Sequence, residues 1–320
     1  MRKRILIIFS VILILLCAYI VYDSAIRMNK PNEESEIEGK DISKEEYVYK
    51  EELLGLGYTV EEVSIIENTI SNVDVKNYLL TQKYNNLIAF VSSPYFDITK
   101  IERYENYYAK KPDYTTDEVV LYVEIGLDYE FYTNIKEITN YTDITTLINK
   151  YNILPKDATF NDLVSVPKEY SIGTNKVRAV VLDPLKQMIK DAKKDGAKLS
   201  VLSSFRTWNT QTTLFKNNKK KNGEAHALMY SAKPGHSEHQ LGLAIDFNKA
   251  SMKFEGTKEC EWLKQNAYKY GFIMRYPKGK EYITGFAYEP WHYRYLGVEI
   301  ATKVYEENIT YEEYLVKYKK

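Results

Sequence analysis

Hydrophobic residues are unevenly distributed along this chain, and the most apolar segment comes first. Residues 5–22 are almost uninterruptedly apolar and directly follow the basic cluster Met1-Arg2-Lys3-Arg4. A run of this length is at the lower end of what spans a bilayer as a helix, and the basic residues before it favour a cytoplasmic N-terminus. We therefore expect a basic cap and membrane anchor over residues 1–28 with an exported remainder, and a cleaved signal peptide as the alternative.

The next part of the chain changes from polar to helical. Residues 29–50 are acid-rich, which suits a solvated stalk. Thr59 and Glu62 have the spacing of a capping box, and apolar residues follow at helical intervals. Asp74 to Leu80 and Thr99 to Tyr108 repeat this pattern. We expect a small helical module over residues 51–115, and no motif in it carries chemistry.

A different pattern begins at Val119, where alternating positions up to Ile125 predict a strand. We place the start of a second domain, residues 116–320, here. Asp183 and Pro184 have the sequence of a helix start, and Gly196 that of its end. Further segments predict strands at 198–203, 243–247, 282–286 and 292–295 and helices at 208–221 and 258–270. Helices mixed with short, hairpin-like strands predict an α+β fold.

Composition and charge exclude several classes of protein. The 320 residues carry 44 Lys and Arg against 44 Asp and Glu, whereas a dedicated nucleic-acid binder has a basic surplus. Cys17 lies in the apolar run, so the exported part has only Cys260 and cannot form an intramolecular disulfide. Cys260 shares a predicted helix face with Leu263 and Ala267, which indicates a core residue and not a catalytic thiol.

Two polar segments contain three of the four histidines. The first, residues 234–247, has histidines on a glycine-punctuated turn, followed by Asp246 inside an apolar strand. A buried carboxylate needs a strong partner, and a metal ion is one. The second is Glu289-Pro290-Trp291-His292, where the proline predicts a turn. Glu289 and His292 converge only if this turn folds Glu289 back over the site.

Two histidines and an aspartate leave an open fourth position, which is the pattern of catalytic zinc. Glu289 is the candidate for a carboxylate that is not a ligand and takes a proton from water. The alternative is that Asp246 forms a salt bridge and His292 is a buried core residue with satisfied hydrogen bonds. Spacing alone leaves both interpretations open.

Three ordered motifs resemble one enzyme family. Ser-Glu-His-Gln-x-Gly-x-Ala-x-Asp (237–246), Glu-Pro-Trp-His (289–292) and Ser-Ser-Phe-Arg (203–206) closely resemble the VanY-type D-alanyl-D-alanine carboxypeptidases. Their superfamily includes lysostaphin-like peptidases and the hedgehog signalling domain. The likeness covers roughly residues 119–297. It departs at Phe205, where many relatives have Tyr, and at Lys233, where Arg is commoner, and neither residue belongs to the expected metal site.

The resemblance implies roles for individual residues. One Zn²⁺ would be held by His239, Asp246 and His292, with Glu289 as general base and Arg206 stabilising the oxyanion. The resemblance also implies that Ser237 lies near the terminal group of the substrate and that Gln211 supports the loop of Arg206. His236 is expected to be a loop residue and His226 a surface residue. The implied fold is a small, mainly antiparallel sheet flanked by helices, like the hedgehog and D,D-peptidase domains.

Together these observations predict a membrane-anchored, monomeric enzyme with an extracytoplasmic catalytic domain. The resemblance implies a zinc D,D-carboxypeptidase that removes the terminal D-Ala from peptidoglycan stem peptides. A D,D-dipeptidase or an endopeptidase on the same scaffold is the alternative within enzymes. The alternative of another class is a non-catalytic wall-binding or sensing module, and the presence of both Glu289 and Arg206 counts against it.

Overall fold

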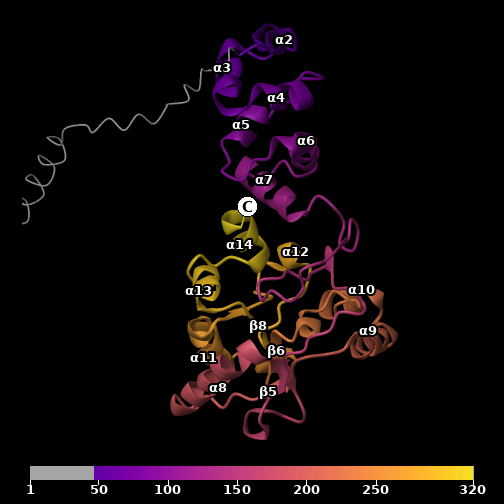
Figure 1. Cartoon of the computed structure of the whole chain (residues 1–320), viewed down its shortest axis with the longest axis vertical. Coiled ribbons are helices and arrows are strands. Elements are labelled where there is room, and N and C mark those ends of the chain that lie inside the picture. The colour runs from indigo at the N-terminus through magenta and orange to yellow at the C-terminus, as the bar shows by residue number, and fades with distance from the viewer. Residues whose placement is uncertain (1–46, 320) are drawn as a thin grey trace, which may run out of the picture. The chain divides into compact units, whose positions relative to one another are not determined.

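Short helices joined by tight turns form the N-terminal part of the chain in the computed structural model, which describes residues 47–319 (Figure 1). They are α2 (Lys50–Gly55), α3 (Val60–Thr69), α4 (Asn72–Asp74), the π-helical η1 (Val75–Leu79), α5 (Leu87–Val91), the 3-10 helix η2 (Ile98–Lys100), α6 (Ile101–Lys110) and α7 (Thr116–Ile125). The Thr59 side chain accepts a hydrogen bond from the Glu62 amide, and Glu62 accepts one from the Thr59 amide. The predicted capping box is therefore confirmed.

Helix α7 shows that the strand predicted over residues 119–125 is wrong. Thr115 and Glu118 form a second capping box, and Gly126 ends the helix in the left-handed conformation, with φ of 98°. From Val119 to Ile125 only Glu124 is charged, so this segment fits a period of two as well as one of 3.6. The caps decide in favour of the helix, and α7 packs against α6 and against α14 (Tyr311–Tyr318).

A four-stranded sheet is the centre of the remaining chain. Its strands are β5 (Val201–Ser203), β6 (Ala244–Phe247), β8 (His292–Tyr295) and β7 (Phe272–Met274), in that order and all antiparallel. Two small sheets pair β1 (Lys136–Glu137) with β2 (Asn152–Ile153) in parallel and β3 (Leu163–Ser165) with β4 (Lys176–Arg178) antiparallel. The expectation of a small, mainly antiparallel sheet is confirmed.

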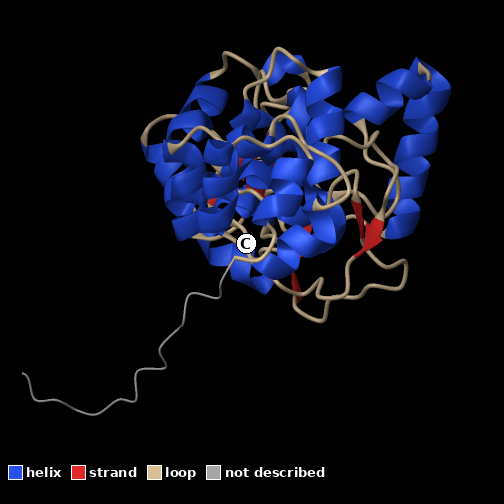
Figure 2. Ribbon diagram, turned by 90° about the horizontal axis from the view of Figure 1, so that it is seen from above, coloured by secondary structure: helices blue, strands red, loops and turns tan. Residues whose placement is uncertain are grey.

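Helices surround these strands (Figure 2). They are α8 (Ala179–Lys194), α9 (Trp208–Asn222), α10 (Glu224–Tyr230), α11 (Lys258–Asn266), α12 (Glu281–Thr284), α13 (Val298–Glu306) and α14, with 3-10 turns η3 (Lys168–Tyr170), η4 (Glu238–Leu241), η5 (Met252–Phe254) and η6 (Ala267–Tyr270). Cys260 on α11 is fully buried, as predicted, and its amide is capped by the Thr257 side chain. The mixture of helices with a small sheet confirms the α+β class.

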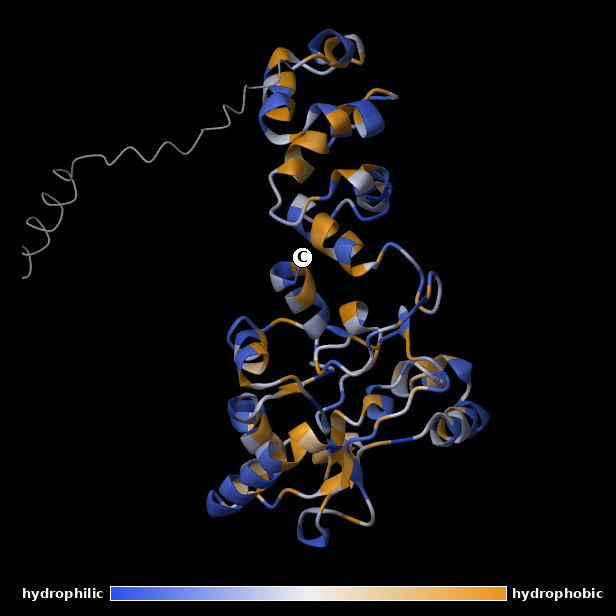
Figure 3. Ribbon diagram, viewed as in Figure 1, coloured by the Kyte–Doolittle hydropathy of each residue, from blue (hydrophilic) through white to orange (hydrophobic). Residues whose placement is uncertain are grey.

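The sheet has one apolar and one polar face. Tyr293 and Tyr295 of β8 join Ile245 and Phe247 of β6 in the main hydrophobic core, together with residues of α8 and α11. Figure 3 shows orange, hydrophobic stretches where the central strands lie. Because side chains alternate along a strand, the residues between them point to the opposite face. That face carries Asp246, and it is where the polar chemistry gathers.

Two further element predictions need correction. Helix α8 begins at Ala179, so Pro184 lies inside it and is not its first residue. Its buried stripe starts at Val181, and burying that stripe outweighs the single hydrogen bond that a proline cannot donate. The segment 282–286, predicted as a strand, contains the short helix α12, which Gly285 ends in the left-handed conformation.

The predicted anchor over residues 1–28 and most of the predicted stalk over 29–50 lie outside the described residues. Within residues 47–319, the structure has no helix long and apolar enough to cross a membrane. Residues 49–320 group as one compact unit by their contacts, and the boundary that we place at residue 116 stays a prediction.

Candidate active site

The antiparallel pairing of β6 with β8 brings two of the predicted ligands together. Asp246 is directly opposite His292 in the register of the two strands. Both side chains are buried, and Nδ1 of His292 lies 3.2 Å from Oδ1 of Asp246. Neighbours across an antiparallel pair share one face of the sheet, so this contact follows directly from the register.

His239 approaches the same point from η4. Its Nε2 lies 3.3 Å from Oδ2 of Asp246, and its Nδ1 lies 2.8 Å from the Ser204 carbonyl oxygen. A carbonyl only accepts, so Nδ1 carries the proton and the lone pair of Nε2 faces the cluster. Gly242 makes the tight connection from η4 to β6, since it adopts φ of 68° directly after the 3-10 turn. His239, Asp246 and His292 thus form one buried group whose donor atoms all lie within 4.8 Å of one another.

Glu289 is folded back over this group by the turn at Pro290. The His292 amide donates to the Glu289 carbonyl, and the Glu289 amide donates to the Tyr276 carbonyl. As a result, Oε2 of Glu289 lies 3.6 Å from Nδ1 of His292. The turn therefore brings Glu289 and His292 together, as the sequence analysis required. Burial raises the pKa of Glu289 to about 8, which puts its carboxyl near the range of a general base.

The pKa values of the two histidines are shifted in opposite directions. Burial, assisted by the positive charge of Arg206, lowers the pKa of His239 to about 4. Burial alone would lower the pKa of His292 as well, but the nearby carboxylates of Asp246 and Glu238 outweigh it and raise this pKa to about 9. A histidine binds a metal through an unprotonated nitrogen, and the low pKa of His239 favours this form at neutral pH.

Arg206 reaches the cluster from the loop after β5. Its Nη2 donates to Oδ2 of Asp246 at 2.6 Å, and Nε and Nη2 both donate to Oγ of Ser203. The Arg206 amide also donates to the His239 carbonyl. Arg206 is thus fixed beside the carboxylate that the metal would share, with 21 % of its side chain exposed to the pocket.

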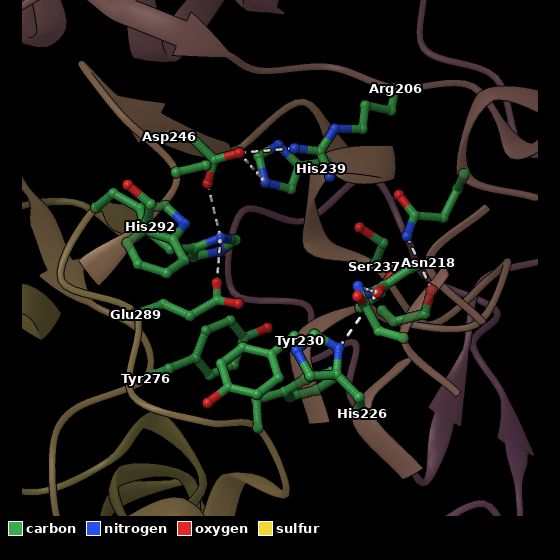
Figure 4. Close-up of a pocket in the computed structure, with 18 of the residues that line it drawn as sticks. Arg206, Asn218, His226, Tyr230, Ser237, His239, Asp246, Tyr276, Glu289 and His292 are labelled. Carbon is green, nitrogen blue, oxygen red and sulfur yellow. Dashed lines mark hydrogen bonds and ion pairs between the residues drawn. The ribbon is translucent and has the colours of Figure 1, made fainter. Parts of the chain in front are cut away.

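All the predicted site residues line one pocket of about 400 Å³, and Figure 4 shows several of them pointing into it. These are Arg206, Gln211, Ser237, His239, Asp246, Glu289 and His292. Ser237 is 4 % exposed. Nε2 of Gln211 donates to the Ala232 carbonyl, so this side chain ties α9 to the segment before the histidine motif.

The donor set fits a divalent metal. Oδ1 of Asp246 is buried and makes no hydrogen bond within the described part of the chain, and Nδ1 of His292 faces it at 3.2 Å. Buried polar atoms normally have partners, and orphaned ones in a cluster of ligand residues indicate a place for an ion. Two imidazoles and one carboxylate match three-ligand zinc sites that keep a position open for water or substrate.

Sequence reasoning missed several residues around the site. The ring of Tyr276 lies 4.8 Å from that of His292 and lines the pocket, yet nothing distinguishes it among the 30 tyrosines of the sequence. His226 is exposed as predicted, but it also lines the pocket and stacks on Tyr230. His236 is a buried loop residue whose Nδ1 bonds to the Asn149 carbonyl oxygen.

Comparisons with known proteins agree with this geometry. Residues 174–298 match the family VanY, D-alanyl-D-alanine carboxypeptidase. The chain is 39 % identical over 213 residues to YodJ of Bacillus subtilis (strain 168), which is classed as a carboxypeptidase, covering 62 % of this chain and 78 % of YodJ. It is 35 % identical to a D-alanyl-D-alanine carboxypeptidase of Enterococcus faecalis (strain ATCC 700802 / V583), covering 53 % of this chain and 64 % of that protein.

A solved structure is also similar. The LdcB LD-carboxypeptidase is 38 % identical, with a TM-score of 0.54, over 57 % of this chain and 90 % of that one. The family match over residues 174–298 contains His239, Asp246, His292, Glu289 and Arg206, and it leaves the helices α2–α7 outside.

Proposed function

The chain belongs to the VanY-type family of D-alanyl-D-alanine carboxypeptidases, and on that premise we propose that the pocket around Glu289 removes the terminal D-Ala from peptidoglycan stem peptides. The enzyme is a zinc metallopeptidase. The observation that carries the proposal is the convergence of His239, Asp246 and His292 beside the buried carboxyl of Glu289. A fold alone hosts many functions, whereas this constellation fits one reaction class, metal-assisted peptide hydrolysis.

We assign the three clustered residues as zinc ligands and Glu289 as the general base. A zinc ion held by them would lower the pKa of water and polarise a peptide carbonyl. Glu289 takes a proton from the attacking water and returns it to the departing amine of D-Ala. Its raised pKa, about 8, suits both steps because the carboxyl can hold and release a proton near neutral pH.

Arg206 is the candidate for oxyanion stabilisation. Its bonds to Ser203 and Asp246 use Nε and Nη2, which leaves the N–H groups of Nη1 to meet developing negative charge. Removing one such donor costs about 3 kcal/mol in other hydrolases. Ser237, which lines the same pocket, is assigned to the terminal carboxylate end of the substrate, and Gln211 to support of the loop that carries Arg206.

The bond that is cut decides between enzymes on this scaffold. An L,D-carboxypeptidase, which removes D-Ala from a stem tetrapeptide, is the second candidate because the LdcB structure is 38 % identical and 90 % covered. A D,D-dipeptidase or an endopeptidase would use the same metal and base. A non-catalytic wall-binding module is disfavoured, since binding alone needs neither Glu289 nor Arg206.

The test is incubation of residues 31–320 with a stem pentapeptide ending in D-Ala-D-Ala, a tetrapeptide ending in one D-Ala, and a cross-linked dimer. Mass spectrometry before and after chelation identifies the products. Loss of one Ala from the pentapeptide, abolished by chelator and restored by zinc, supports the proposal. Cleavage of the tetrapeptide alone assigns the L,D activity, loss of a dipeptide or opening of the dimer assigns the other cuts, and no cleavage at all favours the binding module.

We also propose that the protein is a monomer held at the outer face of the cell membrane by its apolar N-terminal segment. The basic cluster before residues 5–22 supports this orientation. Protease added to intact cells without their wall should remove the catalytic part. Recovery of the enzyme in the medium would instead indicate a cleaved signal peptide.

A further inference from the structure

Behind the ligand cluster lies a group of four buried charges, Glu238, Arg275, Arg294 and Glu312, which we call the buried quartet. None of them is more than 2 % exposed. Oε1 of Glu238 accepts from Nε of Arg275 and from Nη1 of Arg294, each at 2.9 Å. Glu312 of α14 accepts from Nη1 and Nη2 of Arg275 at 2.9 and 2.6 Å. The two positive and two negative charges balance.

The sheet places this quartet directly under His292. His292 and Arg294 are two residues apart on β8 and therefore share a face. Arg275 follows β7, and its amide donates to the His292 carbonyl. Glu238 opens η4, one residue before His239, yet only His239 lines the pocket. The two neighbours thus point to opposite sides, with Glu238 directed into the protein interior.

One carboxylate oxygen of the buried quartet has no hydrogen-bond partner within the described chain. Oε2 of Glu238 is buried and makes no hydrogen bond within the described chain, and it lies 3.9 Å from Nε2 of His292, which also makes none. The other nitrogen of this imidazole, Nδ1, faces Asp246 and Glu289. Burying four charges is costly compared with an apolar core, so the quartet is poorly explained as a source of stability alone.

We propose that Glu238 is a positioning residue for His292. Its carboxylate, fixed by Arg275 and Arg294, keeps the proton on Nε2 and turns the lone pair of Nδ1 toward the metal. Carboxylates beside metal-binding histidines act in this way, and their loss typically weakens metal affinity about 10- to 100-fold. This inference rests on the metal site of the proposed function but not on the bond that the enzyme cuts.

The test compares Glu238→Gln with Glu312→Gln in residues 31–320. Both substitutions remove one negative charge from the same arginine, but Glu312 bonds to Arg275 and Asn149 and not to His292. Zinc affinity is measured by competition with a coloured chelator, and the stability of each metal-free variant by urea unfolding. Glu238→Gln should weaken zinc binding about 10- to 100-fold, and Glu312→Gln less than about 3-fold, at a similar loss of stability.

Equal losses of zinc affinity in the two variants, or unchanged affinity in Glu238→Gln, would overturn the positioning role. If Glu238→Gln yields no folded protein, the charge-neutral double variant Glu238→Gln, Arg294→Met replaces it, and the same loss of affinity is expected. A wild-type chain that binds no zinc would contradict the metal site itself. Failure of the metal site is thus distinguished from failure of the positioning role, because the wild type alone reveals it.

Discussion

Glu289 acquires its reactivity from its surroundings. It is 8 % exposed, and burial raises its pKa to about 8. Asp246 lines the same pocket, yet its pKa stays well below the ordinary range. Burial would raise the pKa of Asp246 too, but His239, His292 and Arg206 outweigh it. Two carboxyls in one pocket are thereby separated into a proton carrier and a permanent anion, a division of roles that acid–base chemistry needs.

The first prediction concerns Glu289→Gln. Glutamine keeps the volume and the turn but cannot take a proton, so kcat should fall about 10²- to 10⁴-fold. Zinc binding should be unchanged, because Glu289 is not assigned as a ligand. Release of D-Ala and bound zinc are measured on the same samples. His239→Ala is the control and should lose both, and substantial turnover by Glu289→Gln would rule out the assigned base.

Lys150 provides a pH-dependent prediction away from the metal. It is 4 % exposed, its Nζ donates to the Leu228 carbonyl at 2.8 Å, and it lies over the rings of Phe131 and Phe286. Burial lowers the pKa of Lys150 to about 8. Between pH 8 and the ordinary value near 10.5, the unfolded chain holds a proton that the folded chain has lost, so this residue makes the free energy of unfolding rise with pH.

Replacing Lys150 with Met removes this titration. From pH 7 to pH 10, the wild type should gain about 2 kcal/mol in unfolding free energy relative to Lys150→Met. Urea unfolding of both proteins at several pH values measures the difference, and other titrating groups cancel in it. A difference that is constant with pH would show that Lys150 keeps an ordinary pKa.

At the scale of elements, caps and not periodicity define helix α7. Gly126 ends it with φ of 98°, and a side chain added there would meet only Tyr151, at 4.0 Å. The cost of Gly126→Ala is therefore conformational, about 1 kcal/mol in the free energy of unfolding. Gly55, inside α2 and with no atom within 4 Å of an added Cβ, is the matched control. Gly55→Ala should stabilise by up to about 1 kcal/mol in the same urea titration, and a similar loss in both variants would contradict this account.

The errors of the sequence prediction have one physical origin. The helix start at Thr59 and Glu62 and the helical segment 258–270 agree with the sequence prediction because their signals are local. Residues 119–125 are apolar nearly throughout, and such a segment fits either period until its neighbours are known. The sequence predicts a helix start at Pro184, but burial of Val181 extends α8 upstream of it. In each case tertiary packing decided the element.

The site likewise contains residues that local motifs predict and residues that only the fold brings together. His239 and Asp246 lie close in sequence, and Glu289 is joined to His292 by a tight turn, so motifs predicted all four. Tyr276 and the members of the buried quartet come from separate segments and carry no distinctive spacing. Arg275, for example, meets Glu312 only because α14 packs back onto the sheet region. Contacts of this range are properties of the fold and cannot be read from local pattern.

At the scale of the whole molecule, the net charge of zero means that substrate is not drawn in by a general electrostatic field. Recognition rests on local charges in the pocket, and the metal would be the strongest of them. The site places Asp246, Arg206 and two histidines at close range, and Oδ1 of Asp246 has no hydrogen-bond partner among residues 47–319. The folded chain offers these ligands together and the unfolded chain does not, so zinc must stabilise the fold by mass action.

The last prediction measures this coupling. At free zinc 100-fold above its Kd, the free energy of unfolding should rise by about 2.7 kcal/mol, which for a unit of this size raises Tm by roughly 5 to 10 °C. Excess chelator should reverse the rise. Glu289→Gln should keep it, because the base is not a ligand, whereas His239→Ala should lose it. A Tm that zinc leaves unchanged in the wild type, or raises equally in His239→Ala, would show that the cluster of His239, Asp246 and His292 does not hold the ion.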